Sequence, residues 1–259
     1  MSHEYLKVEV KNHVQYITIN RPEVYNALNF DAKMEIVQSI REGNKNSEVR
    51  CLVLTGEGKA FCSGQDLNDR NVQGEKVDLG HTLETEWNPL INTIRSSKKL
   101  IIGAINGVAA GAGLNVAMAC DFIVAKKGAK FVSGFSQLGL APDAGSSFTF
   151  VKGLGYKKTL EFFLFNQPLL AEDLEKVGMV NNVGEDVLAL AKEMGEKISC
   201  MAPLSLELIK KNLQSAEEKT FTECMQKETA TQRFLGASED YQEGLKAFFE
   251  KRSPVFTGS

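Results

Sequence analysis

A chain of 259 residues with 43% hydrophobic and 24% charged residues has the composition of a globular protein and the length of one large α/β domain. Its formal net charge of -3 provides no broad basic surface for a nucleic-acid backbone. The five cysteines are scattered without C-x-x-C spacing, which indicates neither a disulfide framework nor a zinc site and is typical of a reducing cytosol. We therefore expect a cytoplasmic protein without a bound metal and without a nucleic-acid partner.

The sequence predicts neither secretion nor membrane insertion. The first residues lack a basic segment followed by an apolar one, so no signal peptide is predicted. The longest apolar run, residues 100–120, is interrupted by glycines and asparagines and predicts no membrane span.

The first third of the chain alternates between strand and helix patterns. Residues 5–10 and 14–19 alternate apolar and polar side chains, which predicts a β-hairpin. Asn29 is suited to cap a helix whose broad apolar face carries Met34, Ile36, Val37 and Ile40. A short buried strand is predicted at residues 51–55 because an apolar run there ends at glycines.

The strand and helix patterns continue after a polar stretch at residues 68–80. Apolar spacing predicts a long helix through Trp87, Leu90, Ile91 and Ile94. Buried strands are predicted at residues 100–105, 121–125 and 130–132, with a helix through Val116 and Met118 after the first of them. Strands that alternate with helices without long linkers predict one wound α/β core.

The chain after about residue 195 has helical patterns only. They cover residues 203–213, 221–235 and 240–251, and their apolar stripes need a partner surface. We therefore divide the chain into a core at residues 1–195, which contains the active site, and a helical region at residues 196–259, which mediates oligomerisation.

Two glycine-rich segments follow buried strands. The first is Gly58–Leu67, and the second is Asn106–Asn115, which leads into a helix. Glycine allows a backbone to approach a ligand closely, and two such turns facing each other can direct two N–H donors at one oxygen, as in an oxyanion hole. Tight packing explains either turn taken alone. The second turn also lacks the full G-x-G-x-x-G fingerprint of dinucleotide binding, because Val116 occupies the last position.

Asp143 is the candidate acid or base. It follows Pro142 in an apolar segment, where it could form a turn, cap the next helix or act in catalysis. An apolar pocket favours the protonated form of a carboxylate and makes it a better proton shuttle.

Nucleophilic catalysis has less support. His3, His13 and His81 lie in the hairpin region and the polar stretch, and no G-x-S-x-G motif is present. Cys62 has no partner that the sequence identifies, so we expect it to be a small packed residue.

Taken together, these segments resemble the crotonase superfamily of enoyl-CoA hydratases and isomerases. Asn20–Leu28 is similar to the first signature of that superfamily, Leu54–Leu67 to the first half of its oxyanion hole and Asn106–Asp121 to the second half. The resemblance implies an α/β spiral of stacked strand-strand-helix turns with a C-terminal helical region that builds a homotrimer or a dimer of trimers. It also implies an acyl-CoA substrate, in which coenzyme A is part of the substrate, and no further cofactor.

Within the superfamily, the chain is most similar to the ring-1,2-epoxyphenylacetyl-CoA isomerases of bacterial phenylacetate breakdown. The similar segments are Phe61–Val72, Asn106–Gly113, Phe135–Asp143 and Arg252–Gly258. By position, the resemblance implies that the backbone N–H groups of Gln65 and Ala112 are the oxyanion donors and that Asp143 is the acid/base. It implies a CoA-binding groove lined by Val24, Ala60, Ser63, Asp66 and Leu67.

The chain departs from the superfamily at two places. The two glutamates of the hydratases are replaced by Asn115 and Phe135, neither of which moves a proton at neutral pH, so isomerisation is favoured over hydration. Ser146-Ser147 replaces a glycine-rich sequence and is similar to the Δ3,Δ2-enoyl-CoA isomerases. An epoxide isomerase, a Δ3,Δ2-enoyl-CoA isomerase and a hydratase therefore stay open, as does a catalytically silent acyl-CoA- or RNA-binding relative. The retained acid and both glycine-rich turns count against a silent protein, and the acidic balance counts against RNA binding.

Overall fold

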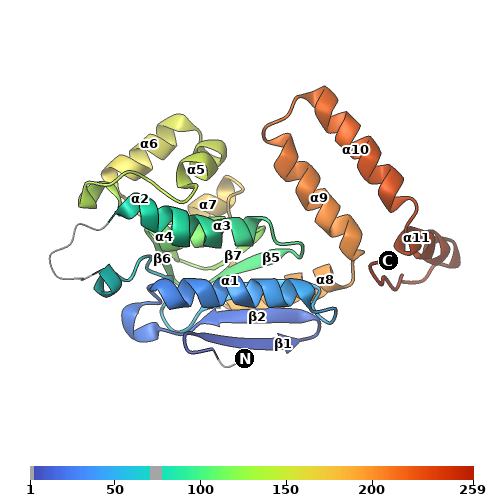
Figure 1. Ribbon diagram of the computed structural model, residues 1–259, viewed down its shortest axis with the longest axis horizontal. Coiled ribbons are helices and arrows are strands. Elements are labelled where there is room, and N and C mark those ends of the chain that lie inside the picture. Colours follow the sequence, from blue (N-terminus) through green and yellow to red (C-terminus); the bar gives the residue numbers. More distant parts are fainter. Residues whose placement is uncertain (1–2, 71–77) are drawn as a thin grey trace.

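The computed structural model describes residues 3–70 and 78–259, and it contains two sheets (Figure 1). Residues 71–77 of the polar stretch lie outside the described residues. The larger sheet has six strands in the order β1-β2-β3-β5-β7-β10, and the smaller has four in the order β4-β6-β8-β9. The larger sheet consists of β1 (Leu6–Lys11), β2 (Val14–Ile19), β3 (Cys51–Gly56), β5 (Ile101–Ile105), β7 (Phe122–Lys126) and β10 (Asn182–Gly184). The smaller consists of β4 (Ala60–Cys62), β6 (Val108–Ala110), β8 (Lys130–Val132) and β9 (Leu169–Leu170).

The chain passes from the larger to the smaller sheet once in each turn of a spiral. β3 leads to β4, β5 to β6 and β7 to β8, and the successive strands are parallel in each sheet. Helices complete each turn: α2 (Leu79–Thr82) with α3 (Asn88–Arg95), then α4 (Ala112–Met118), then α5 (Ser146–Leu154) with α6 (Tyr156–Phe165). This arrangement confirms the spiral of strand-strand-helix turns that the sequence predicted.

The first helix begins where the sequence predicted. In α1 (Phe30–Lys45), the side chain of Asn29 accepts a hydrogen bond of 2.9 Å from the N–H of Ala32, as an N-cap does. The buried face of the helix includes Ile36, Ile40 and also Lys33. A charged side chain therefore lies on the face that packs against the core.

The predicted long helix through Trp87 is continuous but changes its winding. A π-helical turn, η3 (Leu83–Trp87), joins α2 to α3 just before Pro89. Proline has no N–H to donate and its ring crowds the carbonyl four residues earlier, so a wider turn relieves the contact. The change directs Trp87 into the core, where its side chain is buried.

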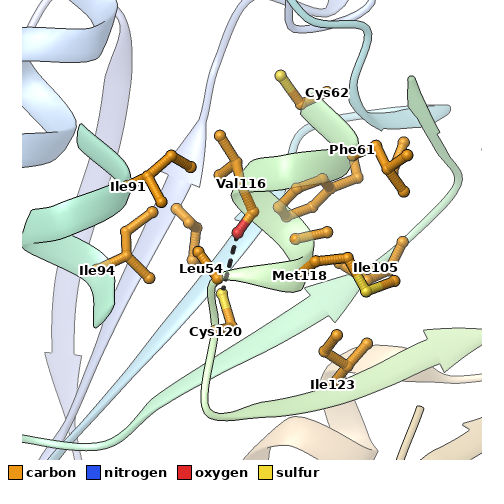
Figure 2. Packing of buried hydrophobic residues seen from close by; sticks show 14 of the residues in the cluster. Leu54, Phe61, Cys62, Ile91, Ile94, Ile105, Val116, Met118, Cys120 and Ile123 are labelled. Atoms are coloured by element: carbon orange, nitrogen blue, oxygen red, sulfur yellow. Dashed lines mark hydrogen bonds between the residues drawn. The ribbon is translucent and has the colours of Figure 1, made fainter. Parts of the chain in front are cut away.

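α4 packs against both sheets, on β4 and β6 of the smaller sheet and on β5 of the larger, within the main buried cluster (Figure 2). Phe61 of the smaller sheet and Ile105 of the larger sheet belong to the same buried cluster as Val116 and Met118. The thiol of Cys120 donates to the carbonyl of Val116 at 3.5 Å, which closes the C-terminal end of the helix. Because every residue of α4 is buried, its N-terminal end is fixed relative to both sheets.

The remaining helices fall into two groups. α7 (Ala171–Lys176) and α8 (Val187–Ser199) belong to the core, whereas α9 (Pro203–Ala216), α10 (Phe221–Leu235) and α11 (Glu239–Glu250) project away from the sheets (Figure 1). A Cβ added to Gly195 would lie 3.1 Å from a methyl of Val14, so α8 packs closely on the larger sheet. The division at residues 195/196 thus falls inside a core helix, and the projecting region begins at α9.

The projecting helices expose several large apolar side chains. They include Leu213, Phe221, Phe248 and Phe249. The role of this region in oligomerisation stays a prediction. None of the helices in residues 3–70 and 78–259 is long and apolar enough to cross a membrane.

Candidate active site

The turn that contains Gln65 forms a short bridge to Leu28. The N–H of Leu28 donates to the carbonyl of Gly64 at 2.8 Å, and the N–H of Asp66 donates to the carbonyl of Leu28 at 3.0 Å. In a trans peptide the C=O and the next N–H point in opposite directions. The N–H of Gln65 therefore points away from Leu28.

The second turn directs the N–H of Ala112 by the same geometry. The carbonyl of Gly111 accepts a hydrogen bond from the N–H of Leu114 at 3.1 Å, so it points along α4. The N–H of Ala112, in the same peptide, then points out of the start of the helix. Gly111 has φ 51° and ψ -129°, a conformation that is open to glycine and not to other residues. Within the described residues, neither this N–H nor that of Gln65 donates to a protein acceptor.

The two turns are in direct contact. Gly64 has φ +97°, and a Cβ added there would lie 2.9 Å from the carbonyl oxygen of Ala110 and 3.2 Å from the nitrogen of Ala112. Any other residue would push the turns apart. The glycine-rich segments that lie far apart in the sequence are thus brought together, as predicted.

Both turns line one cavity of about 210 Å³. Its described lining residues are Ser63, Gln65, Leu67, Trp87, Ala110, Gly111, Ala112, Ser133, Gly134, Phe135, Leu138, Leu140 and Asp143. Most of these side chains are small or apolar. Among them, Asp143 carries the only ionisable side chain, so the cavity combines two unpaired N–H groups with one carboxylate.

Asp143 is half-buried in the segment between β8 and α5. Its carbonyl accepts hydrogen bonds from the N–H and the hydroxyl of Ser146, at 2.9 and 2.7 Å. Ala144, which follows it, has φ +45°, a left-handed conformation that costs about 1–3 kcal/mol for a residue with a Cβ. The N-cap of α5 is Gly145, with no side-chain cap. The carboxylate of Asp143 is therefore not used as a helix cap.

The two positions that the resemblance matches to the hydratase glutamates are Asn115, which contacts this acid, and Phe135, which lines the same cavity. The amide nitrogen of Asn115 donates to the carbonyl of Asp143 at 3.0 Å and to its carboxylate at 3.1 Å. Phe135 is buried and forms part of the cavity wall. Asn115 therefore holds Asp143 by two hydrogen bonds, and Phe135 makes the cavity more apolar.

The residues predicted to bind CoA fall into two groups. Ser63 and Leu67 line the cavity, and the hydroxyl of Ser63 donates to the carbonyl of Val24 at 3.2 Å, in the short helix η1 (Pro22–Val24). Ala60 and Asp66 are buried outside the lining. The carboxylate of Asp66 pairs with Arg21 at 2.8 Å and accepts the N–H of Asn68 at 3.0 Å. A CoA-binding role for these residues stays a prediction.

Sequence reasoning missed the side chains behind Gln65. The buried ammonium of Lys33 and the indole N–H of Trp87 both donate to the Gln65 side-chain oxygen, at 2.9 Å each. Lys33 also pairs with the carboxylate of Glu86. One signal was available, because Lys33 precedes the predicted core residues Ile36 and Val37 by three and four positions and so shares their helix face.

The other candidates for catalysis are not in the cavity. Burial raises the pKa of the Cys62 thiol to about 12, which keeps it protonated and suits a packed residue. His3 and His13 lie at the N-terminal hairpin, and His81 lies on α2. Among the described residues, no three His, Cys, Asp or Glu side chains are grouped as metal ligands would be.

Comparison with known proteins gives a consistent result. Residues 9–259 match the family of enoyl-CoA hydratases/isomerases. The 1,2-epoxyphenylacetyl-CoA isomerase of Escherichia coli K12 is 38% identical, over 98% of this chain and 99% of that protein. The 2,3-dehydroadipyl-CoA hydratase of the same organism is 31% identical, over 98% of each chain. The enoyl-CoA hydratase of Bacillus anthracis has a similar structure, with a TM-score of 0.93 at 27% identity over 99% of this chain and all of that one. The chain therefore belongs to the enoyl-CoA hydratase/isomerase family, the crotonase superfamily, whose members act on acyl-CoA thioesters.

Proposed function

We propose that this protein is a CoA-thioester isomerase that binds the thioester carbonyl oxygen through the N–H groups of Gln65 and Ala112 and moves a proton with Asp143. The observation that carries the proposal is the composition of the cavity. Two N–H groups without a protein acceptor and a single carboxylate line it among the described residues. This is the set of groups that enolate chemistry requires.

In the proposed reaction Asp143 acts twice, and the two N–H donors act between its two steps. The carboxylate of Asp143 removes a proton from the carbon next to the thioester carbonyl, and the electron pair of that C–H bond moves onto the carbonyl oxygen as an enolate. The two N–H donors stabilise this negative charge, and loss of one such donor costs about 2.7–4 kcal/mol. In a 3-enoyl-CoA, Asp143 then delivers this proton to carbon 4, so that the double bond shifts from position 3 to position 2. In the epoxide, the isomerisation would open the strained ring to the oxepin with no atom gained or lost.

The replacement of both hydratase glutamates supports isomerisation over hydration. Hydration needs a group that activates a water molecule as well as one that delivers a proton, and the amide of Asn115 and the ring of Phe135 do neither. Asp143 alone can shuttle one proton between two carbons. The proton that Asp143 takes up in the first step is the one it delivers in the second, and this regenerates the carboxylate.

The proposed substrate is 2-(1,2-epoxy-1,2-dihydrophenyl)acetyl-CoA. The 38% identity to an enzyme of that name supports this assignment, and the rings of Trp87 and Phe135 offer an apolar wall for a cyclic acyl group. The alternative is a Δ3,Δ2-enoyl-CoA, which the Ser146-Ser147 sequence favours. CoA itself would lie against Val24, Ser63 and Leu67. The buried residues Ala60 and Asp66 would support these three residues.

A side-by-side assay tests the proposal. Purified protein is given 3-hexenoyl-CoA, crotonyl-CoA and the epoxyphenylacetyl-CoA, and the products are separated by chromatography. We expect isomerisation of one or both of the first and third compounds and little addition of water to crotonyl-CoA. Hydration as fast as isomerisation would refute the proposed function.

A further inference from the structure

A positive charge is buried directly behind the cavity wall. The side chain of Lys33 on α1 is 0% exposed. Its ammonium contacts the Gln65 side-chain oxygen at 2.9 Å, the carboxylate of Glu86 and the face of the Trp87 ring, whose centroid is 4.8 Å away. A charge that has lost its water needs such partners. These partners come from the first glycine-rich turn and from the π-helical turn η3.

The contacts fix the Gln65 side chain at both ends of its amide. The oxygen accepts hydrogen bonds from Lys33 and from the indole of Trp87, both at 2.9 Å. The nitrogen donates to the carbonyl of Asp66 at 3.1 Å. With all three bonds made, the side chain cannot rotate freely, and the backbone of Gln65 can shift only if the network shifts with it.

We infer that Lys33 and Trp87 are positioning residues that hold the N–H of Gln65 in place for the enolate oxygen. The inference rests on the proposed function, in which this N–H is one of the two oxyanion donors. A donor stabilises developing charge best when it is already oriented before the charge appears. A misplacement of about 1 Å can cost about 10²-fold in rate, so a rigid side-chain anchor has a direct effect on turnover.

Lys33 acts through Gln65 and not on a ligand directly. Its side chain has no exposed surface and is not part of the cavity lining. It therefore cannot reach a phosphate of CoA. Trp87 has two roles, because its ring lines the cavity while its N–H joins the network.

The chain offers a matched control in a second buried lysine. Lys210 of α9 pairs with Asp121 at 2.8 Å, and its side chain is 6% exposed. Neither residue lines the cavity. The substitution of either lysine by methionine removes the same charge from a buried ion pair. Only Lys33→Met also removes a bond to Gln65.

The experiment compares Lys33→Met, Trp87→Phe and Lys210→Met in the full-length protein. For Lys33→Met we expect kcat for the isomerised thioester to fall at least about tenfold and KM to change less than about threefold. The fall in kcat should be smaller than that caused by complete removal of one oxyanion donor. Both methionine variants should lower the melting temperature by similar amounts, but Lys210→Met should keep kcat within about twofold of wild type. Equal kcat values for the two methionine variants would show that Lys33 contributes stability alone.

A second readout does not depend on Asp143. Acetoacetyl-CoA ionises to an enolate that absorbs in the near ultraviolet, so the pH at which the bound molecule ionises reports how well the donors stabilise the charge. We expect this pH to rise in Lys33→Met and Trp87→Phe and to stay at the wild-type value in Lys210→Met. If Lys33→Met does not fold, Trp87→Phe, which keeps an aromatic ring in the core, carries the test. An unchanged ionisation pH in Trp87→Phe then overturns the inference.

The two readouts separate the inference from the proposed function. A wild-type protein that isomerises no thioester but still favours the bound enolate contradicts the proposed reaction and leaves the positioning role measurable. A wild-type protein that binds acetoacetyl-CoA without favouring its enolate shows that Gln65 is not an oxyanion donor, and both statements are then wrong.

Discussion

The two turns that line the cavity are held in different ways. The Ala112 turn is shaped by its own backbone, because Gly111 adopts a conformation closed to other residues and α4 is buried throughout. The Gln65 turn also contains a glycine with a left-handed φ, Gly64, and is bonded to Leu28 through the backbone, but in addition it depends on Lys33 and Trp87 from two separate elements. One donor is therefore held by backbone constraints, and the other by backbone constraints together with polar side-chain contacts across the fold.

This difference has consequences for substitutions. A turn fixed by backbone conformation tolerates changes in its neighbours but not a side chain on its glycine. A turn fixed by side chains can be loosened from a distance, by residues that never touch the substrate. Substitutions can therefore separate these two kinds of support from each other and from proton transfer.

The largest effect on kcat is expected at Asp143, which lies outside both glycine-rich turns. Asp143→Asn keeps the volume of the side chain and removes its proton exchange, so kcat should fall about 10³-fold or more. Binding of a CoA ester should barely change, because both turns stay intact. Steady-state kinetics and a binding titration test this. More than about a tenth of wild-type turnover would mean that another acid acts.

The next largest effect on kcat is expected from loss of the Ala112 N–H donor, whose direction depends on the backbone of Gly111. In Gly111→Ala the added methyl meets only the carbonyl oxygen of Ser133, at 3.9 Å, so space is available, but the residue cannot keep φ 51° with ψ -129°. The peptide that carries the Ala112 N–H should turn, and kcat should fall about 10²–10³-fold.

Gly178→Ala provides the control for this change. Gly178 has φ +78° and open space around it, so alanine should cause strain there without touching the cavity. Kinetics and thermal denaturation of both variants are compared. Comparable kcat losses in the two variants would show that backbone strain, and not the direction of the Ala112 N–H, limits turnover.

A smaller effect on kcat is expected at Asn115, which donates a hydrogen bond to Asp143. Asn115→Ala removes the donor that lies 3.1 Å from the Asp143 carboxylate, and kcat should fall about tenfold or less. Loss of a donor to the charged form favours protonation of the carboxylate. The acidic limb of the pH–rate profile should therefore move to higher pH. A loss as large as that of Asp143→Asn would show that Asn115 takes part in the chemistry.

The smallest effect on turnover is expected from the projecting helices. Phe248 and Phe249 of α11 are each 77% exposed, so Phe248→Ser combined with Phe249→Ser should leave the fold intact and weaken self-association. None of the described lining residues comes from α9, α10 or α11. We therefore expect light scattering to show a smaller particle, with kcat within about threefold of wild type. An unchanged mass would show that these two rings do not face another subunit.

Much of the fold follows from local sequence alone. The hairpin, the Asn29 cap, the buried strands and the long helix through Trp87 depend on side-chain periodicity and on capping, which act over a few residues. The glycine-rich turns and Asp143 were found in the same way and by their resemblance to the superfamily. Residue 195, where the sequence was divided, lies inside α8, which packs on the larger sheet, and helical periodicity does not show what a helix packs against.

The sequence by itself determined which residues could supply N–H donors and a proton, since glycine conformations and a carboxylate next to proline are local properties. Only the tertiary structure decided that Gly64 touches the backbone of Ala112 and that Asp143 lies on the same cavity. It also decided the partners of Lys33, because the contacts of a buried charge come from segments as far apart in the chain as Gln65 and Glu86. Such contacts depend on how the spiral stacks, and no short sequence pattern encodes that.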